Sequence, residues 1–256
     1  MTIGGPALPP RSLSGYRPAM ANTLNILVTG TSRGIGRSIV QALDGHNVIG
    51  HSSRDGDSRR IAADLDRPGA AETLWNEALA RLDGRIDVLV NNAGVFEAAP
   101  IDGSHQHFVS QWERTLRINL IAAAELSRLA IRHFLDRGEG GRIVNIASRA
   151  AYRGDSPDHW HYAASKGGMV AMTKSIARAY AKDKILAFSV CPGFTMSEMA
   201  ADYLASRGGA GILADIPLGR VAEAEEVAET VRWLAVDAPA SATGSAIDVN
   251  GASYVR

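Results

Sequence analysis

Short apolar runs alternate with longer segments of helical periodicity over most of the chain. The apolar runs, which predict buried strands, lie at residues 24–29, 48–52, 60–64, 86–91, 141–147, 186–191 and 246–249. The segments that predict helices lie at residues 36–43, 72–82, about 111–137, 162–182 and 223–236. Because right-handed crossovers place helices on both faces of a parallel sheet, this alternation predicts an α/β fold with a Rossmann-type, doubly wound sheet.

One connection is too short for this scheme. Only residues 53–59 separate the second apolar run from the third. A crossover that includes its helix takes at least about 10–12 residues, whereas seven extended residues reach roughly 23 Å, enough to recross a short strand. We therefore expect the helix between the second and third strands to be missing.

The composition is that of an ordinary globular protein. Of the 256 residues, 46% are apolar and 21% charged, and 27 basic residues balance 27 acidic ones, so neither a nucleic-acid nor a membrane partner is expected. The single cysteine, Cys191, sits in an apolar run and is interpreted as a packed thiol. No apolar run is typical of a signal peptide or a membrane span. We expect a cytoplasmic protein with a loose tail at residues 1–22 and a single domain at residues 23–256.

A glycine-rich turn follows the first predicted strand and opens the first predicted helix. It reads Thr29-Gly30-Thr31-Ser32-Arg33-Gly34-Ile35-Gly36. Glycines permit a tight turn and a close backbone approach, and the free N–H groups of the following helix attract a pyrophosphate. The alternative is a joint in which glycine only provides a positive φ angle. The context of strand, turn and helix favours a dinucleotide site.

Five further landmarks follow the turn in order. They are Asn91-Asn92-Ala93-Gly94, Asn119, Ser148, Tyr162 with Lys166, and Pro192-Gly193. Together with the G-x-x-x-G-x-G spacing of the turn, this set resembles the short-chain dehydrogenase/reductase family, and within it the β-ketoacyl-(acyl-carrier-protein) reductase branch. The resemblance covers about nine tenths of the chain. It implies an oxidoreductase that moves a hydride between a nicotinamide cofactor and a carbonyl or alcohol carbon.

Tyr162 and Lys166 are the candidates for proton transfer. Four residues apart on a predicted helix, they share one face. A free tyrosine hydroxyl has a pKa near 10, but an ammonium about 4 Å away contributes roughly 4 kcal/mol at an effective dielectric constant of 20. This attraction would lower the tyrosine pKa toward neutrality, where the pair can exchange a proton with a substrate oxygen. A surface Tyr/Lys pair is the alternative from the spacing alone.

The resemblance also assigns supporting roles. It implies that Ser148 holds the substrate oxygen, that Asn119 binds a water in the proton path and bends its helix, and that Lys166 grips the nicotinamide ribose. From the residues alone, Ser148 could equally cap a turn, and Asn119 could be capped or face solvent. The spacing of the seven histidines does not indicate a metal site. A rival hypothesis is a non-catalytic nicotinamide-binding redox sensor or scaffold, although such proteins usually lack the tyrosine or the lysine.

The end of the second predicted strand bears on which nicotinamide is used. A carboxylate there would bond the ribose diol and exclude a 2′-phosphate, but residues 48–54 contain none. Arg33, Ser53 and Arg54 could instead hold a phosphate by charge-assisted bonds, unless the arginines are merely solvated. NADP(H) is therefore preferred. NAD(H) stays as the alternative because two aspartates follow closely.

The remaining cofactor contacts follow from the resemblance. Asp64 and Leu65 would contact adenine, and Thr195 or Ser197 would meet the carboxamide. The expected cofactor-binding residues are Gly30, Thr31, Ser32, Arg33, Gly34, Ile35, Gly36, Ser53, Arg54, Asp64, Leu65, Asn91, Ala93, Gly94, Tyr162, Lys166, Pro192, Gly193 and Thr195.

Two segments are expected to contact a small carbonyl or alcohol substrate. Residues 149–161 are rich in aromatic and polar side chains, and residues 194–211 carry apolar side chains that form either a lid or plain packing. Neither identifies the molecule. By resemblance, the chain forms a homodimer or homotetramer through the alanine-rich helical segments 121–131 and 163–181.

Overall fold

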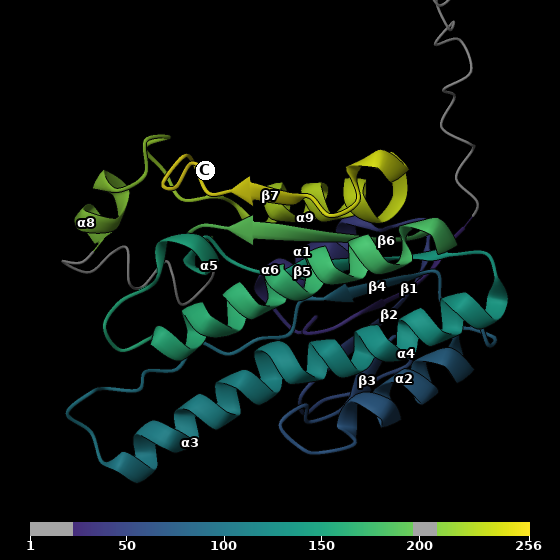
Figure 1. The fold of residues 1–256 in the computed structure, drawn as a ribbon, viewed down its shortest axis with the longest axis horizontal. Coiled ribbons are helices and arrows are strands. Elements are labelled where there is room, and N and C mark those ends of the chain that lie inside the picture. The colour runs from purple at the N-terminus through teal and green to yellow at the C-terminus, as the bar shows by residue number, and fades with distance from the viewer. Residues whose placement is uncertain (1–22, 197–208) are drawn as a thin grey trace, which may run out of the picture.

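Seven parallel strands form one sheet in the computed structural model, which describes residues 23–196 and 209–256 (Figure 1). They are β1 (Asn25–Val28), β2 (Asn47–Ser52), β3 (Arg60–Ala62), β4 (Val88–Asn91), β5 (Gly141–Ile146), β6 (Ile185–Pro192) and β7 (Ala246–Val249). The order across the sheet is β3-β2-β1-β4-β5-β6-β7. The chain winds outward from β1 in both directions, which confirms the Rossmann-type, doubly wound class. The tail at residues 1–22 and most of the expected lid lie outside the described residues.

Helices cover both faces of this sheet (Figure 1). They are α1 (Gly34–Ala42), α2 (Ala70–Arg81), α3 (His105–Leu116), α4 (Ala122–Arg137), α5 (Ala150–Arg153), α6 (Trp160–Tyr180), α8 (Gly209–Ala214) and α9 (Ala224–Arg232). Shorter turns are the π-helical segments η1 (Arg117–Ile121) and η3 (Trp233–Asp237) and the 3₁₀ turns η2 (Ala181–Asp183) and η4 (Ala240–Ala242). Over the two described ranges, no helix has the length and apolarity needed to cross a bilayer.

Two apolar layers attach these helices. One buried cluster joins α2, α4 and α6 to the sheet and includes Leu74, Phe134 and Ile176. The other joins α1 and α9 to the opposite face and includes Ile39 and Val231. Strands buried on both faces cannot alternate apolar and polar residues, so they appear in the sequence as the continuous apolar runs that predicted them.

The long helix expected from about residue 111 to residue 137 differs from the structure in two ways. It begins earlier, at His105, because the Ser104 hydroxyl accepts a hydrogen bond from the His107 N–H at 3.2 Å and caps the first turn. It is also interrupted by the π-helical segment η1, which periodicity alone does not reveal. The predicted start was therefore too late, and the π-helical turn lies around Asn119, where the resemblance implies a bent helix.

The connection between β2 and β3 contains no helix, as its length predicted. The Ser52 hydroxyl accepts a hydrogen bond from the Asp55 N–H at 3.1 Å, and Asp57 pairs with Arg60 at 3.1 Å. These contacts fold residues 53–59 into a short turn. The third strand is also shorter than predicted and ends at Ala62.

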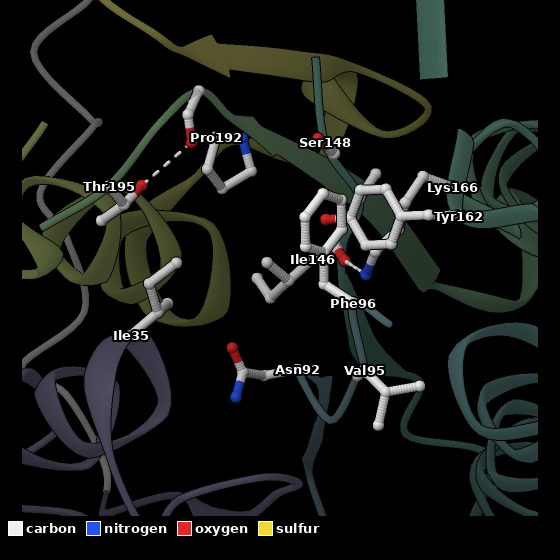
Figure 2. Close-up of a pocket in the computed structure, with 13 residues that line it drawn as sticks. Ile35, Asn92, Val95, Phe96, Ile146, Ser148, Tyr162, Lys166, Pro192 and Thr195 are labelled. Carbon is white, nitrogen blue, oxygen red and sulfur yellow. Dashed lines mark hydrogen bonds between the residues drawn. The ribbon is translucent and has the colours of Figure 1, made fainter. Parts of the chain in front are cut away.

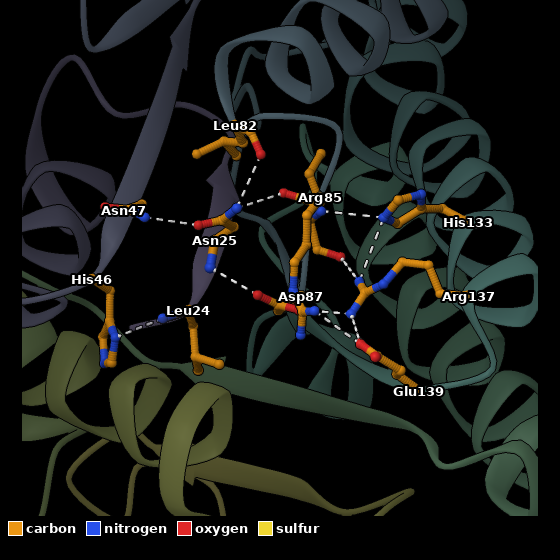
Figure 3. Close-up of polar contacts among 11 residues, drawn as sticks. Leu24, Asn25, His46, Asn47, Leu82, Arg85, Asp87, His133, Arg137 and Glu139 are labelled. Atoms are coloured by element: carbon orange, nitrogen blue, oxygen red, sulfur yellow. Dashed lines mark hydrogen bonds and ion pairs between the residues drawn. The ribbon is translucent and has the colours of Figure 1, made fainter. Parts of the chain in front are cut away.

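The amino edge of the sheet is held by a polar network centred on Asp87 (Figure 3). The Asp87 carboxylate accepts hydrogen bonds from the Asn25 N–H at 3.0 Å, from Arg85 at 2.8 Å and from Arg137 at 2.9 Å. Asp87 is only 8% exposed. Because the network joins β1, the start of β4 and the end of α4, it fixes the edge opposite to the one where ligands bind in such folds.

Candidate active site

A cavity of about 220 Å³ opens beyond the carboxyl ends of β4, β5 and β6 (Figure 2). Eight of its lining residues carry sequence-predicted roles: Ile35, Gly94, Ser148, Tyr162, Lys166, Pro192, Gly193 and Thr195. Five others had no assigned role: Asn92, Val95, Phe96, Ile146 and Ala147. The fold thus brings together segments that lie up to 160 positions apart, from residue 35 to residue 195.

Asn119 lies beneath this cavity rather than in its wall. Its side chain is fully buried in η1, so the solvent-facing alternative is wrong. Its amide accepts a hydrogen bond from the Val95 N–H at 2.8 Å and donates one to the Val95 carbonyl oxygen at 3.0 Å. The amide also donates to the Ser165 hydroxyl at 3.3 Å. Asn119 therefore fixes the loop after β4 against α6, and this loop contributes Gly94 and Val95 to the cavity.

Tyr162 and Ser148 meet at the reacting end of the cavity. Ser148 lies beside Tyr162, and its hydroxyl accepts the Ala150 N–H at 3.1 Å at the start of α5. Burial raises the pKa of Tyr162 to about 12, and the neighbouring Ser148 side chain opposes the rise. The expected lowering of the tyrosine pKa by Lys166 is therefore not found: loss of hydration outweighs every favourable contact.

Lys166 lies on the same face of α6 as Tyr162, as its spacing predicted. Its ammonium donates to the Ile146 carbonyl oxygen at 2.8 Å and lies 5.7 Å from the centre of the Tyr162 ring (Figure 2). Burial lowers the pKa of Lys166 to about 8. A Cβ atom at Gly94 would lie 3.6 Å from this ammonium, so the loop after β4 packs closely against the lysine.

The glycine turn approaches the end of β4 at backbone contact distance. A Cβ atom at Gly36 would lie 2.0 Å from the Gly30 carbonyl oxygen, and one at Gly30 would lie 2.8 Å from the Ala93 Cα. Gly30 also has a φ of +70°. Asn92 completes the joint by donating from its amide to the Thr29 and Gly30 carbonyl oxygens, each at 2.9 Å. Here glycine is needed for close approach as well as for its φ angle.

The residues of this turn fit a pyrophosphate. Helix α1 begins at Gly34 with no side-chain cap and no acidic residue in its first turn. A Cβ atom at Gly34 would meet no atom within 4 Å, so the space in front of the helix is open. Uncapped N–H groups at such a terminus bind anions.

A buried histidine that belongs to no motif ties this turn to the third strand. His51, at the end of β2, is 2% exposed. The Gly30 N–H donates to its Nδ1 at 3.1 Å, and its Nε2 lies 2.8 Å from the Ala63 carbonyl oxygen. The first contact requires an unprotonated Nδ1, so His51 is neutral with its proton on Nε2. Burial lowers the pKa of His51, which agrees with this assignment.

The residues expected around the adenosine phosphate lie at the surface. Arg33, Ser53 and Arg54 are all exposed, and within the described part of the chain neither arginine forms an ion pair. The Asp57 carboxylate is engaged by Arg60 and by the backbone N–H of Arg59. The structure thus leaves two cations and a hydroxyl available for a 2′-phosphate.

The other residues expected to contact the adenosine half of the cofactor differ in their exposure to solvent. Asp64 is exposed, and its carboxylate lies 3.5 Å from Arg67, whereas Leu65 is 5% exposed and packs in the core. Thr31 is buried, and its N–H donates to the His51 carbonyl oxygen at 2.8 Å. Ser32 lies at the surface.

Asn91 does not reach the cavity with its side chain. Its amide donates to the Asn145 side chain at 2.8 Å and to the Ser127 hydroxyl at 3.2 Å, inside the layer between sheet and helices. The next residue, Asn92, lines the cavity instead. Strand alternation, which sends neighbouring side chains to opposite sides, was the signal that distinguishes the two.

Only part of the loop expected to supply substrate contacts faces the cavity. Tyr152 stacks on Tyr254 with ring centres 5.8 Å apart and accepts a hydrogen bond from Arg256, so it faces the C-terminal segment. His159 instead stacks on Phe96 at the cavity.

Cys191 is fully buried and its pKa is raised to about 11, chiefly by burial, which agrees with a packed thiol. Thr195 lines the cavity, and the alternative Ser197 lies outside the described residues.

The fold and the cavity define an oxidoreductase that uses a nicotinamide dinucleotide. Comparison with known proteins gives the family. A family model described as enoyl-(acyl carrier protein) reductase matches residues 30–252. The chain belongs to the short-chain dehydrogenase/reductase family.

Individual relatives agree over nearly the whole chain. A 3-oxoacyl-(acyl-carrier-protein) reductase of Haemophilus influenzae is 34% identical over 242 residues, which cover 90% of this chain and 97% of that protein. A 3β-hydroxysteroid dehydrogenase of Eggerthella lenta is 30% identical over 88% of this chain and 92% of that protein. Among solved structures, a candidate NAD(P)-dependent gluconate 5-dehydrogenase from Beutenbergia cavernae with NADP bound at low occupancy has a TM-score of 0.81. It is 31% identical and covers 92% of this chain and 98% of that one.

Proposed function

We propose that this enzyme interconverts a ketone or aldehyde and the corresponding alcohol with NADP(H), with Tyr162 as the general acid and base. The observation that carries the proposal is the single cavity that holds Ser148, Tyr162 and Lys166 together, next to the glycine turn. The bound nicotinamide supplies or accepts the hydride. All other chemistry falls to side chains of this chain.

In the reducing direction, Tyr162 protonates the carbonyl oxygen as negative charge develops on it. With a pKa of about 12, the hydroxyl holds its proton throughout the neutral range and is ready to donate it. Ser148, which lines the cavity beside Tyr162, orients the substrate oxygen. Lys166 places a positive charge near the developing oxyanion, and Asn119 keeps the loop at Val95 in register with α6.

The preference for NADP(H) rests on charge at the end of β2. Arg33, at the start of α1, and Arg54, after β2, are both exposed, and Asp57 is engaged by Arg60. The solved relative from Beutenbergia cavernae has NADP bound, which supports the same preference. A bidentate arginine contact to a phosphate contributes more than a neutral hydrogen bond, so we expect NADPH to bind more tightly than NADH.

The proposal is tested with Tyr162→Phe, which removes the hydroxyl and keeps the ring. Reduction of a panel of ketones and aldehydes is followed by the loss of NADPH absorbance. We expect kcat to fall by a factor of about 10² or more, the range of general acid catalysis, while the Kd for NADPH changes little. Undiminished turnover in the variant would refute the role of Tyr162. Binding of NADPH without turnover of any carbonyl would favour the sensor or scaffold hypothesis.

The proposal also covers the domain organisation, the localisation and the oligomeric state of the enzyme. We infer that residues 23–256 act as one dinucleotide-binding catalytic domain in the cytoplasm, and that two or four copies associate through α4 and α6. Ile121, which immediately precedes α4, is a large apolar residue that is 38% exposed, which supports a contact on this side of the molecule. Light scattering after size-exclusion chromatography measures the assembly, and a monomer at micromolar concentration would contradict it.

A further inference from the structure

Three aromatic rings meet at the mouth of the cavity. Phe96, one of the lining residues, stacks on His159 with ring centres 3.8 Å apart and planes at 5°. It also meets the Tyr162 ring at 4.8 Å and 87°. Even so, Phe96 is 56% exposed. A large apolar ring that is open to solvent beside the reacting hydroxyl offers a binding surface that protein packing does not use.

This surface is built rather than incidental. The loop that carries Phe96 is bonded to the segment that carries His159, because the Ala99 N–H donates to the Asp158 carbonyl oxygen at 2.8 Å. A second tie joins His161 Nε2 to the Glu97 carbonyl oxygen at 2.9 Å. Rings held in place before binding lose little conformational freedom when a ligand stacks on them.

The size of the cavity limits what can enter it. At about 220 Å³, it is smaller than the roughly 300–1,000 Å³ typical of pockets that enclose a drug-sized ligand. The nicotinamide and the reacting carbon must share that volume. The rest of a larger substrate therefore extends outward past Tyr162, where Phe96 and His159 lie.

The two arginines that follow Ser148 in the chain are not free to pair with an anion. Arg153 bonds Asp215 at 2.6 Å, and Arg149 lies 3.4 Å from the same oxygen. A phosphate-bearing thioester would need free cations. Within the described residues, these two arginines therefore give no support for an anionic substrate.

We propose that the substrate bears a flat, uncharged aromatic or conjugated ring a few bonds from its carbonyl carbon, and that this ring packs against the Phe96–His159 pair. The inference rests on the proposed function, since it assigns a substrate class to the same site. It makes Phe96 a specificity-determining residue and leaves the proton chemistry with Tyr162.

A matched pair of ketones tests it. Benzylacetone and its cyclohexyl analogue have the same carbonyl reactivity, because two methylene groups insulate the carbonyl from the ring, but only benzylacetone can stack. Wild-type enzyme should have a kcat/KM for benzylacetone about three- to tenfold higher than for the cyclohexyl ketone, the range of binding free energy that an aromatic pair contributes in proteins. The difference should lie in KM. Phe96→Leu keeps an apolar side chain and should bring the ratio to about one, because leucine offers no ring for stacking.

Trp160→Leu is the matched control. Trp160 is 47% exposed and follows His159 directly, but it neither lines the cavity nor stacks on Phe96. This variant should keep the wild-type preference. Because Phe96 and Trp160 are both exposed, neither substitution should impair folding, and a thermal melt verifies this.

Three results would overturn the proposal: no wild-type preference for the aromatic ketone, a preference that persists in Phe96→Leu, or more efficient reduction of an acetoacetyl thioester than of any ring ketone. If no carbonyl is reduced at all, the proposed function fails separately. Saturation-transfer NMR with benzylacetone and the NADPH-bound protein then still decides the question. Transfer to the ring protons that is lost in Phe96→Leu supports stacking, and equal transfer in both proteins contradicts it.

Discussion

Replacing His51 with leucine should loosen the adenosine half of the site. The imidazole accepts the Gly30 N–H at 3.1 Å and bonds the Ala63 carbonyl oxygen at 2.8 Å, and leucine can do neither. Each buried group left without a partner costs about 1–3 kcal/mol. We therefore expect His51→Leu to lower the free energy of unfolding by about 2–5 kcal/mol. The lost restraint on Gly30 should also weaken NADPH binding by about tenfold or more, since tenfold corresponds to 1.4 kcal/mol.

The same contact predicts how the stability of the fold depends on pH. Protonated His51 would direct an Nδ1–H at the Gly30 N–H, and burial holds its folded-state pKa below the ordinary value of 6.5. The unfolded chain therefore takes up this proton first, so the stability that neutral His51 contributes is complete above about pH 6.5 and is lost as the pH falls below it. His133 and His161, whose pKa values burial also lowers, add a loss of the same sign.

The assay is titration of NADPH by its fluorescence at about pH 5.5 and 8, together with urea denaturation at each pH. His51→Asn is the matched variant, because its amide oxygen can still accept the Gly30 N–H and does not titrate in this range. Wild-type protein should lose free energy of unfolding at the lower pH, and His51→Asn should show less of this loss. If His51→Leu binds NADPH as tightly as wild type at both pH values, the histidine does not position the turn and the reasoning is refuted.

Three further predictions concern other parts of the molecule. Alcohol oxidation needs the ionised tyrosine, so with a pKa of about 12 for Tyr162 the log of its rate should rise with pH through about pH 7–10, and a plateau below pH 7 would contradict this. Gly36→Ala places a Cβ atom 2.0 Å from the Gly30 carbonyl oxygen, so it should lower the free energy of unfolding by at least about 1–3 kcal/mol and weaken NADPH binding. Gly211→Ala, whose Cβ atom would meet nothing within 4 Å, is the control in the same NADPH titration. Asp87→Asn should lower the urea midpoint by the equivalent of about 2–3 kcal/mol but leave the Kd for NADPH within about twofold, and a large change in that Kd would show that the two edges of the sheet are coupled.

Much of the fold was predictable because the strands are buried on both faces. Their continuous apolar runs located all seven strands, and the length of the segment at residues 53–59 revealed the missing helix. The segment η1 was not predictable from local propensity, because a single π-helical turn depends on packing around Asn119. The resemblance implied only that the helix bends there. The start of α3 was missed since its first residues, His105 and those after it, are polar and exposed.

The candidate site, like the fold, has features that the sequence predicts and features that it does not. Side chains whose chemistry recurs at fixed spacing, such as Ser148 and Tyr162, could be named from the sequence. Their pKa values could not, because loss of hydration depends on the surrounding fold. His51 and Phe96 were missed because each acts through a contact distant in the chain, at Gly30 and at His159.

The π-helical turn also sets how far α3 is rotated about the helix axis relative to α4. An α-helix advances 100° per residue, so the one extra residue in a π-helical turn offsets α3 from α4 by about that angle. No single apolar stripe can therefore run from His105 to Arg137. Deleting one residue from η1 would straighten the helix and rotate α3, carrying the fully buried Thr115 about a quarter turn away from the core. The length of this segment is thus more strictly constrained than its composition: the chain can exchange residues here more readily than it can lose one.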